Sequence, residues 1–259
     1  MLLDDIVSSK KTEVVNIKKQ FQFITLSNLA DAFPPARDFK AAIGRAGRVN
    51  LIAEMKQASP SAGTIVADYI PEPIAKKYES SGAAALSVLT DGPFFKGLLG
   101  HLKVAKQATD LPVLRKDFII DEIQVFESRL AGADAILVIL RILDDEKLKK
   151  LLEEAKKVNL AVMAEAHNEA EVERALSAGA EIIGINNRDL DSLKVDFNLS
   201  LKMVSKFPEL KKKVLVSESG IGSRSQIDEL RSAGYNAVLI GEALLKSPDP
   251  AKKIKELGL

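Results

Sequence analysis

The sequence predicts an α/β protein in which eight parallel strands close into a (β/α)8 barrel. A short sequence motif that contains glycine and alanine recurs at residues 81–86, 131–136, 178–183 and 233–238. Each copy follows an amphipathic stretch and precedes a short apolar run, which is typical of a helix that ends at glycine before a buried strand. Successive copies stand roughly 50 residues apart, which is too long for one strand-helix unit of ~30 residues and suits two compact ones.

A second apolar run precedes each copy, so every repeat supplies two strands. Strict alternation of strands and helices predicts a parallel sheet, and eight units point to a closed barrel. The rival is an open doubly wound sheet, which usually carries a glycine-rich fingerprint after its first strand, and residues 54–59 do not form one. The expected strands are 50–56, 84–89, 112–116, 135–140, 160–165, 182–186, 213–217 and 237–241, with clear helical stretches at 122–130, 145–157, 169–178 and 224–232.

The segment 1–48 precedes the first strand and is too small to hold a core of its own. We therefore interpret 1–259 as a single barrel domain that carries 1–48 as an N-terminal helical extension. Helices are expected at 3–19 and 39–46, with a turn or loop at 31–35. Pro250 is expected in the first turn of the last helix, where proline is favoured.

Composition and charge argue against several classes of protein. A net charge of +1 gives no electrostatic reason to expect nucleic acid or an anionic membrane as partner. Because cysteine is absent, there is no disulfide, thiolate metal site or cysteine nucleophile, and two distant histidines argue against a histidine-rich metal site. No apolar run approaches the ~20 residues that span a bilayer, and the N-terminus lacks a signal-peptide pattern. We expect a cytoplasmic protein that works as a monomer without a metal.

Polar residues gather where the strands end, which is the catalytic face of such barrels. Glu54 and Lys56 stand two residues apart at the end of a buried strand, so their side chains share one side of it. The strand residues before them are apolar. Charged side chains that point into the barrel explain this pattern better than side chains on the protein surface. The side chains expected at this face are Glu54, Lys56, Lys116, Glu165, Asn186, Arg188, Glu218 and Ser219.

Glycines after the seventh and eighth strands predict a phosphate site. Gly220 and Gly241 each stand at a turn into a helix, where small residues let the backbone approach an anion and helix N-termini direct N–H groups toward it. Loops after these two strands often bind phosphate in barrels. Ser59, in the loop after the first strand, can close the third side. Glu242 is expected to turn its side chain outward while its backbone N–H faces the anion.

Two lysines and two or three carboxylates around a phosphate pocket favour proton-transfer chemistry on a phosphorylated small molecule. A lysine paired with Glu54 or Glu165 should stay charged and act as an acid. Asp117 is expected to cap its turn, and the histidines His101 and His167 are expected to take no part. An aromatic wall that suits a planar substrate is expected from Phe94, Phe95 and Phe118.

Four motifs resemble those of indole-3-glycerol phosphate synthases, the cofactor-free barrel enzymes of tryptophan biosynthesis. They are residues 53–61, 114–118, 184–190 and 217–221, and they stand in order at successive strand ends. The similarity extends over residues 49–245. It implies ring closure of 1-(2-carboxyphenylamino)-1-deoxyribulose 5-phosphate to an indole, with release of carbon dioxide and water and with neither cofactor nor metal.

The resemblance also implies roles for individual residues. Lys116 would be the general acid that protonates the ketone oxygen, and Glu165 the general base of the later steps. Glu54 and Lys56 would assist dehydration, and which lysine donates in which step stays open. Asn186 and Ser219 would support catalysis by positioning the substrate. The expected substrate-binding residues are Arg188, Phe95, Phe118 and Glu218, and the expected phosphate-binding residues are Ser59, Gly220 and Gly241.

Two other functions remain open at this point. A Schiff-base aldolase would use Lys116 as a nucleophile rather than as an acid. A catalytically silent barrel could serve as a binding or scaffold module, although a scaffold need not keep the full set of strand-end charges. The isomerase of the preceding pathway step is expected to use a cysteine base, and this chain has no cysteine.

Overall fold

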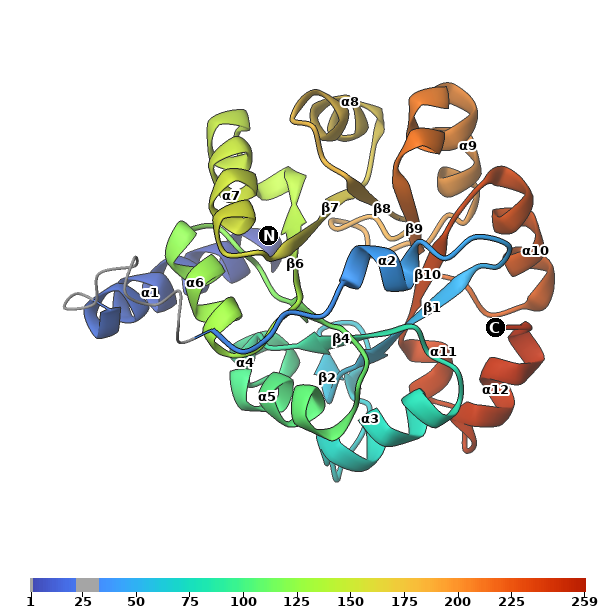
Figure 1. Cartoon of the computed structure of the whole chain (residues 1–259), viewed down its shortest axis with the longest axis horizontal. Helices are drawn as coiled ribbons and strands as arrows, with labels where there is room; N and C mark the ends of the chain where they lie inside the picture. Colours follow the sequence, from blue (N-terminus) through green and yellow to red (C-terminus); the bar gives the residue numbers. More distant parts are fainter. Residues whose placement is uncertain (1, 22–32) are drawn as a thin grey trace.

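The computed structural model describes residues 2–21 and 33–259, and its strands form a closed barrel surrounded by helices (Figure 1). In this described part, eight parallel strands run around the barrel in the order β1, β10, β9, β8, β7, β6, β5 and β4. Closure occurs at β1, where Ile52 lies opposite Leu239 of β10 on one side and Ala85 of β4 on the other. The predicted (β/α)8 fold is confirmed.

The elements lie close to their predicted positions, with most bounds differing by one or two residues. The barrel strands are β1 (Asn50–Met55), β4 (Ala85–Leu89), β5 (Val113–Lys116), β6 (Ala135–Ile139), β7 (Ala161–Ala166), β8 (Ile182–Asn186), β9 (Val214–Glu218) and β10 (Ala237–Ile240). The longer helices that follow them are α3 (Pro71–Ser80), α5 (Leu99–Ala108), α6 (Glu122–Leu130), α7 (Asp145–Lys157), α8 (Glu169–Ser177), α9 (Asn198–Lys206), α10 (Arg224–Ala233) and α12 (Pro250–Leu257).

Short elements in the loops were not predicted from the sequence. An antiparallel pair follows β1, and single turns of helix follow several other strands. They depend on local hydrogen bonds that leave no periodic pattern in the sequence. They are β2 (Ala58–Ser59), β3 (Gly63–Thr64), α4 (Gly92–Phe95), η2 (Leu140–Ile142), η3 (Pro208–Lys212) and α11 (Glu242–Leu245).

The core has two layers, as the alternation of side chains along each strand requires. On β1, Leu51 and Ala53 face the surrounding helices, whereas Ile52 belongs to the inner layer with residues such as Met163 and Leu239. The inner layer fills the barrel, so Glu54 and Lys56 can face inward only at the open end. The predicted register of the first strand is therefore confirmed.

Two helices precede the barrel in the described part of the extension. Helix α1 (Leu2–Phe21) packs against α6, and α2 (Phe39–Ile43) lies across the barrel in Figure 1. Phe39 and Ile43 join the inner layer of the core, so α2 closes the end from which the strands start. The predicted helix 39–46 is shorter than expected because it ends before Gly44. The loop expected at 31–35 is described only from Phe33 onward, where it has no regular structure.

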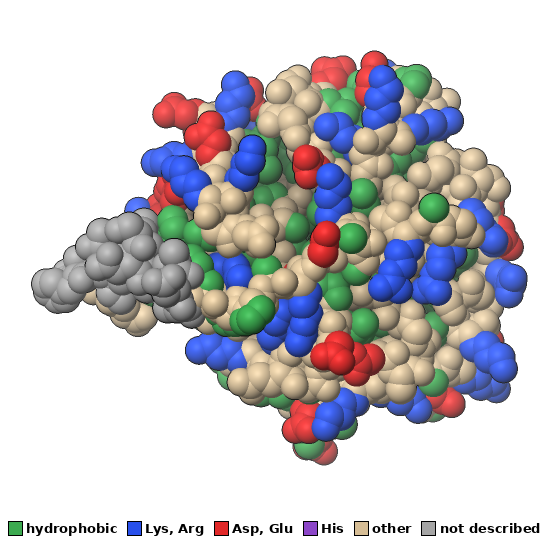
Figure 2. Space-filling model, in the orientation of Figure 1, with side chains coloured by type: hydrophobic (Ala, Val, Ile, Leu, Met, Phe, Trp, Pro, Cys, Tyr) green, Lys and Arg blue, Asp and Glu red, His purple; other side chains and the backbone are tan. Residues whose placement is uncertain are grey.

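The glycines of the repeated sequence motif lie at the C-terminal ends of helices, as predicted. Gly82, Gly132, Gly179 and Gly234 all have positive φ angles, between 78° and 98°, where residues with a Cβ are strained. Basic and acidic side chains are interspersed over the face shown in Figure 2, in keeping with the net charge of +1. Among the residues described, no helix has the length and apolar character needed to cross a membrane.

Candidate active site

A pocket of about 660 Å³ lies at the end of the barrel where the strands finish. All of the predicted site residues except Phe94 contribute to its lining, although they come from separate strands and loops. They are Glu54, Lys56, Ser59, Phe95, Lys116, Phe118, Glu165, Asn186, Arg188, Glu218, Ser219, Gly220 and Gly241. Of the two candidate phenylalanines at 94 and 95, it is Phe95 that lines the pocket.

The first ion pair joins the two charges of β1. Nζ of Lys56 lies 2.5 Å from Oε1 of Glu54, whose side chain is almost fully buried. Burial opposes ionisation of Glu54, but Lys56 and then Lys116 outweigh it and hold the pKa of the carboxyl below its ordinary value. Gly241 makes room for this carboxylate, because a Cβ there would lie 2.1 Å from Oε1 of Glu54.

Lys116 lies between two further carboxylates. Its Nζ is 3.4 Å from Oε2 of Glu165 on β7 and 3.4 Å from Oε2 of Glu218 on β9. Burial alone would lower the pKa of Lys116, but Glu165 and Glu218 outweigh burial and raise the pKa above its ordinary value. Lys116 is thus held as an ammonium ion, which can donate a proton and is a poor nucleophile.

Glu165 and Glu218 face the same ammonium but have opposite tendencies to ionise. Burial disfavours the Glu165 carboxylate, yet Lys116 and His167 outweigh burial and hold its pKa well below the ordinary value. Burial and the negative charge of Glu165 together raise the pKa of Glu218 to about 8. Carboxyl groups whose environments push their pKa values apart are suited to act as a base and an acid in one site.

An aromatic wall closes one side of the pocket. The rings of Phe95 and Phe118 lie with their centroids 6.1 Å apart and their planes tilted by 39°. The first turns of α1 add apolar side chains to the pocket lining, from Leu2, Leu3 and Ile6. The N-terminal extension therefore contributes directly to the pocket, which the sequence did not indicate.

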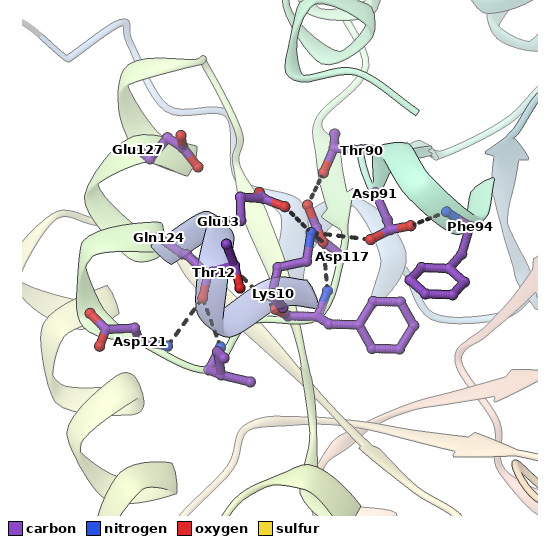
Figure 3. Close-up of polar contacts among 12 residues, drawn as sticks. Lys10, Thr12, Glu13, Thr90, Asp91, Phe94, Asp117, Asp121, Gln124 and Glu127 are labelled. Carbon is purple, nitrogen blue, oxygen red and sulfur yellow. Dashed lines mark hydrogen bonds and ion pairs between the residues drawn. The ribbon is translucent and has the colours of Figure 1, made fainter. Parts of the chain in front are cut away.

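Figure 3 shows a buried ionic cluster beside this wall, where Lys10 of α1 reaches the loops that follow β4 and β5. Its Nζ lies 2.8 Å from Oδ1 of Asp117, 3.2 Å from Oδ2 of Asp91 and 2.7 Å from Oε2 of Glu13. Lys10 is only 1% exposed. Burial opposes its charge, but Asp117 and Glu13 outweigh burial and raise the pKa of Lys10. The cluster ties α1 to the open end of the barrel.

The two aspartates of this cluster also hold the aromatic wall. Oδ1 of Asp91 accepts the backbone N–H of Phe94 at 3.0 Å, which caps the short helix α4 that carries the first ring. Oδ1 of Asp117 accepts the backbone N–H of Phe118 at 2.8 Å. Lys10 therefore bridges the two loops from which the wall is built.

At the opposite side of the pocket, the backbone after β9 adopts an unusual conformation. Ser219 has a φ of 68° and Gly220 a φ of 74°, and positive φ is uncommon for a residue other than glycine. Nδ2 of Asn187 donates to the carbonyl oxygen of Ser219 at 3.0 Å, which helps to hold this turn. Such strain is often found at functional sites.

The loop after β8 brings Arg188 to the same side. Its backbone N–H donates to Oδ1 of Asn186 at 3.0 Å, and its Nη1 donates to the carbonyl oxygen of Leu193 at 3.0 Å. Glu242 is the first residue of α11, and its half-exposed side chain pairs with Lys246 at 2.6 Å and with Arg188 at 3.5 Å. Because Glu242, Arg188 and Lys246 all line the pocket, these contacts place the Glu242 carboxylate at the rim of the pocket, and its predicted outward direction is not confirmed.

The structure shows contacts of two residues that the sequence did not indicate. Asp117 caps its turn as expected, but it also pairs with Lys10 and, at 3.0 Å, with Arg115. His167, which the sequence predicts to take no part, lies outside the pocket lining, and its Nε2 is 3.1 Å from Oε1 of Glu165. In the part of the chain that the structure describes, no group of three or more His, Asp or Glu side chains is arranged to hold a metal ion.

Comparison with known proteins agrees with the four motifs and the pocket. The family profile "Indole-3-glycerol phosphate synthase" matches residues 3–257. The chain belongs to this family. The indole-3-glycerol phosphate synthase of Endomicrobium trichonymphae is 46% identical over 259 residues, with 99% of each chain covered. That of Roseiflexus sp. (strain RS-1) is 43% identical over 263 residues, covering 99% of this chain and 98% of the relative.

Membership of this family identifies the reaction. Members close the indole ring of 1-(2-carboxyphenylamino)-1-deoxyribulose 5-phosphate with loss of carbon dioxide and water, so this chain is a carboxy-lyase of tryptophan biosynthesis. Solved structures also share the fold. A 3-hexulose-6-phosphate synthase matches 81% of this chain and 98% of its own, with a TM-score of 0.61 and 18% identity, which shows likeness of fold alone.

The buried cluster yields a first prediction. Replacing Lys10 by methionine leaves Asp91 and Asp117 with less compensating charge in the interior, so the free energy of unfolding should fall by about 3 kcal/mol. The neighbouring Lys11 is exposed, and Lys11→Met should change stability by no more than about 0.5 kcal/mol. Denaturant unfolding measures both. Equal stability of the two variants would show that the cluster does not hold α1 in place.

Proposed function

We propose that Lys116 and Glu165 are the main general acid and general base of the ring closure. The observation that carries this proposal is the position of the Lys116 ammonium, 3.4 Å from Glu165 and 3.4 Å from Glu218 in the pocket. Proton donation by a charged lysine and proton removal by an ionised carboxylate can then occur within one site. The family reaction needs both, because an oxygen leaves as water and a carbon loses a proton.

The first step forms the carbon–carbon bond. The aromatic carbon that bears the carboxylate attacks the ketone carbon of the substrate. As the bond forms, the ketone oxygen gains electron density and takes a proton from Nζ of Lys116, so it becomes a hydroxyl group. Loss of carbon dioxide then returns the electron pair of the broken bond to the ring and restores its aromatic character.

The second part of the reaction removes water. The new hydroxyl group leaves with a proton supplied by a lysine, and Glu165 takes a proton from the neighbouring carbon, which forms the double bond of the indole. Glu54 and Lys56 lie 2.5 Å apart at the same end of the barrel and are proposed to assist this step. The lysine that protonates the leaving oxygen is either Lys56 or Lys116.

The remaining predicted residues are proposed to bind the substrate. Its phosphate would lie among Ser59, Gly220 and Gly241, where backbone N–H groups and the start of α11 favour an anion. Its aromatic ring would lie against the aromatic wall of Phe95 and Phe118. The groups between these two ends are Asn186, Arg188, Glu218 and Ser219, which are proposed to orient the chain of the sugar.

The purified protein should convert the carboxyphenylamino-deoxyribulose phosphate to a fluorescent indole product in the presence of EDTA. We expect this because the proposed chemistry uses only side chains of the pocket. Fluorescence against time measures the reaction, and circular dichroism checks that the protein is folded. Folded protein that gives no fluorescence increase in EDTA would contradict the proposal.

Lys116→Met and Glu165→Gln should each lower kcat by at least about 100-fold, the lower range for a general acid or base, while substrate binding is largely kept. Lys103→Met removes an exposed lysine of α5 and should leave kcat unchanged. Borohydride treatment with substrate provides a separate check on Lys116. An unchanged rate in either variant would remove the assigned role, and a covalent adduct at Lys116 would favour the aldolase mechanism instead.

A further inference from the structure

His167 lies directly after β7, two residues beyond Glu165, and is not part of the pocket lining. Its side chain is 2% exposed, and so is that of Glu165. The histidine therefore contacts the proposed general base from the protein side, where it does not meet the substrate. A buried ionisable group in this position needs an explanation, because burying a charge without compensation is costly.

The imidazole of His167 lies between two carboxylates. Its Nε2 is 3.1 Å from Oε1 of Glu165, and its Nδ1 is 3.1 Å from Oε2 of Glu171. Nδ1 hydrogen-bonds to Glu171, whereas Nε2 has no aligned hydrogen bond among the described residues and meets Glu165 as a close ion pair. A neutral imidazole has one N–H and one unprotonated nitrogen, so one of the two carboxylates would face an unprotonated nitrogen at 3.1 Å. An imidazolium has an N–H at both nitrogens. The arrangement therefore fits the charged form of the ring.

The far carboxylate is itself fixed at the start of α8. Oε2 of Glu171 accepts the backbone N–H of His167 at 2.7 Å, and Oε1 accepts from Nδ2 of Asn168 at 2.7 Å. Asn168 caps the helix by accepting the backbone N–H of Glu171 at 2.9 Å. The dipole of α8 also favours a negative charge in its first turn. Glu171 thus provides a rigid anchor for one side of the ring.

We propose that His167 is a positioning residue, an imidazolium held between Glu171 and Glu165 that keeps the Glu165 carboxylate ionised and turned toward Lys116. The inference rests on the proposed role of Glu165 as general base. It assigns to Glu171 and the start of α8 a task in catalysis, although neither meets the substrate. Oε1 of Glu165 faces His167, and Oε2 is left to Lys116 and the reacting carbon.

The ionisation of these groups agrees with the geometry. Burial would lower the pKa of His167, but Glu165 and Glu171 outweigh burial and raise it to about 9. For Glu171, burial is outweighed by His167, so the pKa of this carboxyl falls below its ordinary value. The other charged groups that face Glu165 are Lys116 from β5, Glu54 from β1 and Glu218 from β9.

The direction in which removal of His167 shifts the pKa of Glu165 can therefore be predicted. Glu165 would lose a cationic neighbour, so its pKa would rise and a larger share of the enzyme would hold a protonated, inactive base. The acidic limb of kcat against pH should then move to higher pH by about one unit or more, which is about tenfold in rate on that limb. A merely structural role would lower stability without moving this limb.

The chain has only two histidines, which makes the charge of His167 directly measurable. In long-range proton–nitrogen NMR spectra of the wild-type protein, the His101→Gln variant identifies the signals of each ring. We expect His167 to show two protonated nitrogens at about pH 7, whereas burial lowers the pKa of His101 and leaves that ring neutral. A neutral His167 ring at this pH would overturn the inference, whatever the activity of the protein.

Kinetics of matched variants complete the test. His167→Gln keeps a polar side chain without the charge, and Glu171→Gln removes the anchor; both should shift the acidic limb of kcat upward and leave KM within about twofold. His101→Gln should leave the limb in place. Folded His167→Gln with an unshifted limb would overturn the positioning role. If Glu165→Gln itself kept full activity, the proposed function would fail while the NMR result still stood, so the two failures are distinguishable.

Discussion

The site depends on the need to balance charge where the barrel strands end. Lys116, Glu165 and Glu218 are all buried or nearly so, and burial alone shifts the pKa of each toward its neutral form. Together they hold one ammonium and one carboxylate in the charged form and make the second carboxyl group harder to ionise. The same balance that permits these charges in the interior also prepares them for proton transfer.

The rest of the molecule maintains this arrangement from two sides. From the extension, Lys10 bridges Asp91 and Asp117 and so joins α1 to the loops that carry the aromatic wall. From the helix layer, Glu171 holds His167 against Glu165. Gly184 and Gly241 leave room for two of the carboxylates. A Cβ at position 184 would collide with Glu218, and a Cβ at position 241 would collide with Glu54. The buried carboxylates of the site therefore depend on glycine at these two positions.

The fold and most of the pocket residues could be predicted from the sequence, because the strands of a closed barrel all end at the same face. Each strand end could be read from its own apolar run, and residues as distant as Glu54 and Glu218 had to meet once the sheet closed. Lys10 could not be found in this way, since nothing in an amphipathic helix rich in lysine distinguishes it from Lys11 before the packing of α1 is known. A signal for His167 did exist, because it stands two residues after Glu165, where continued strand alternation would place both side chains on the same side. The roles of the pocket residues stay predictions, because position alone does not establish chemistry.

The charge of the Lys116 side chain tests the central claim most directly. Nitrogen NMR of the side-chain ammonium groups, assigned with Lys116→Met, can follow its protonation as the pH is raised toward about 10.4, where exposed lysines lose their protons. Lys116 should keep its proton beyond that point, because Glu165 and Glu218 raise its pKa. Loss of the proton from Lys116 before the exposed lysines would contradict the account, since the lysine would then be a neutral amine at the heart of the site.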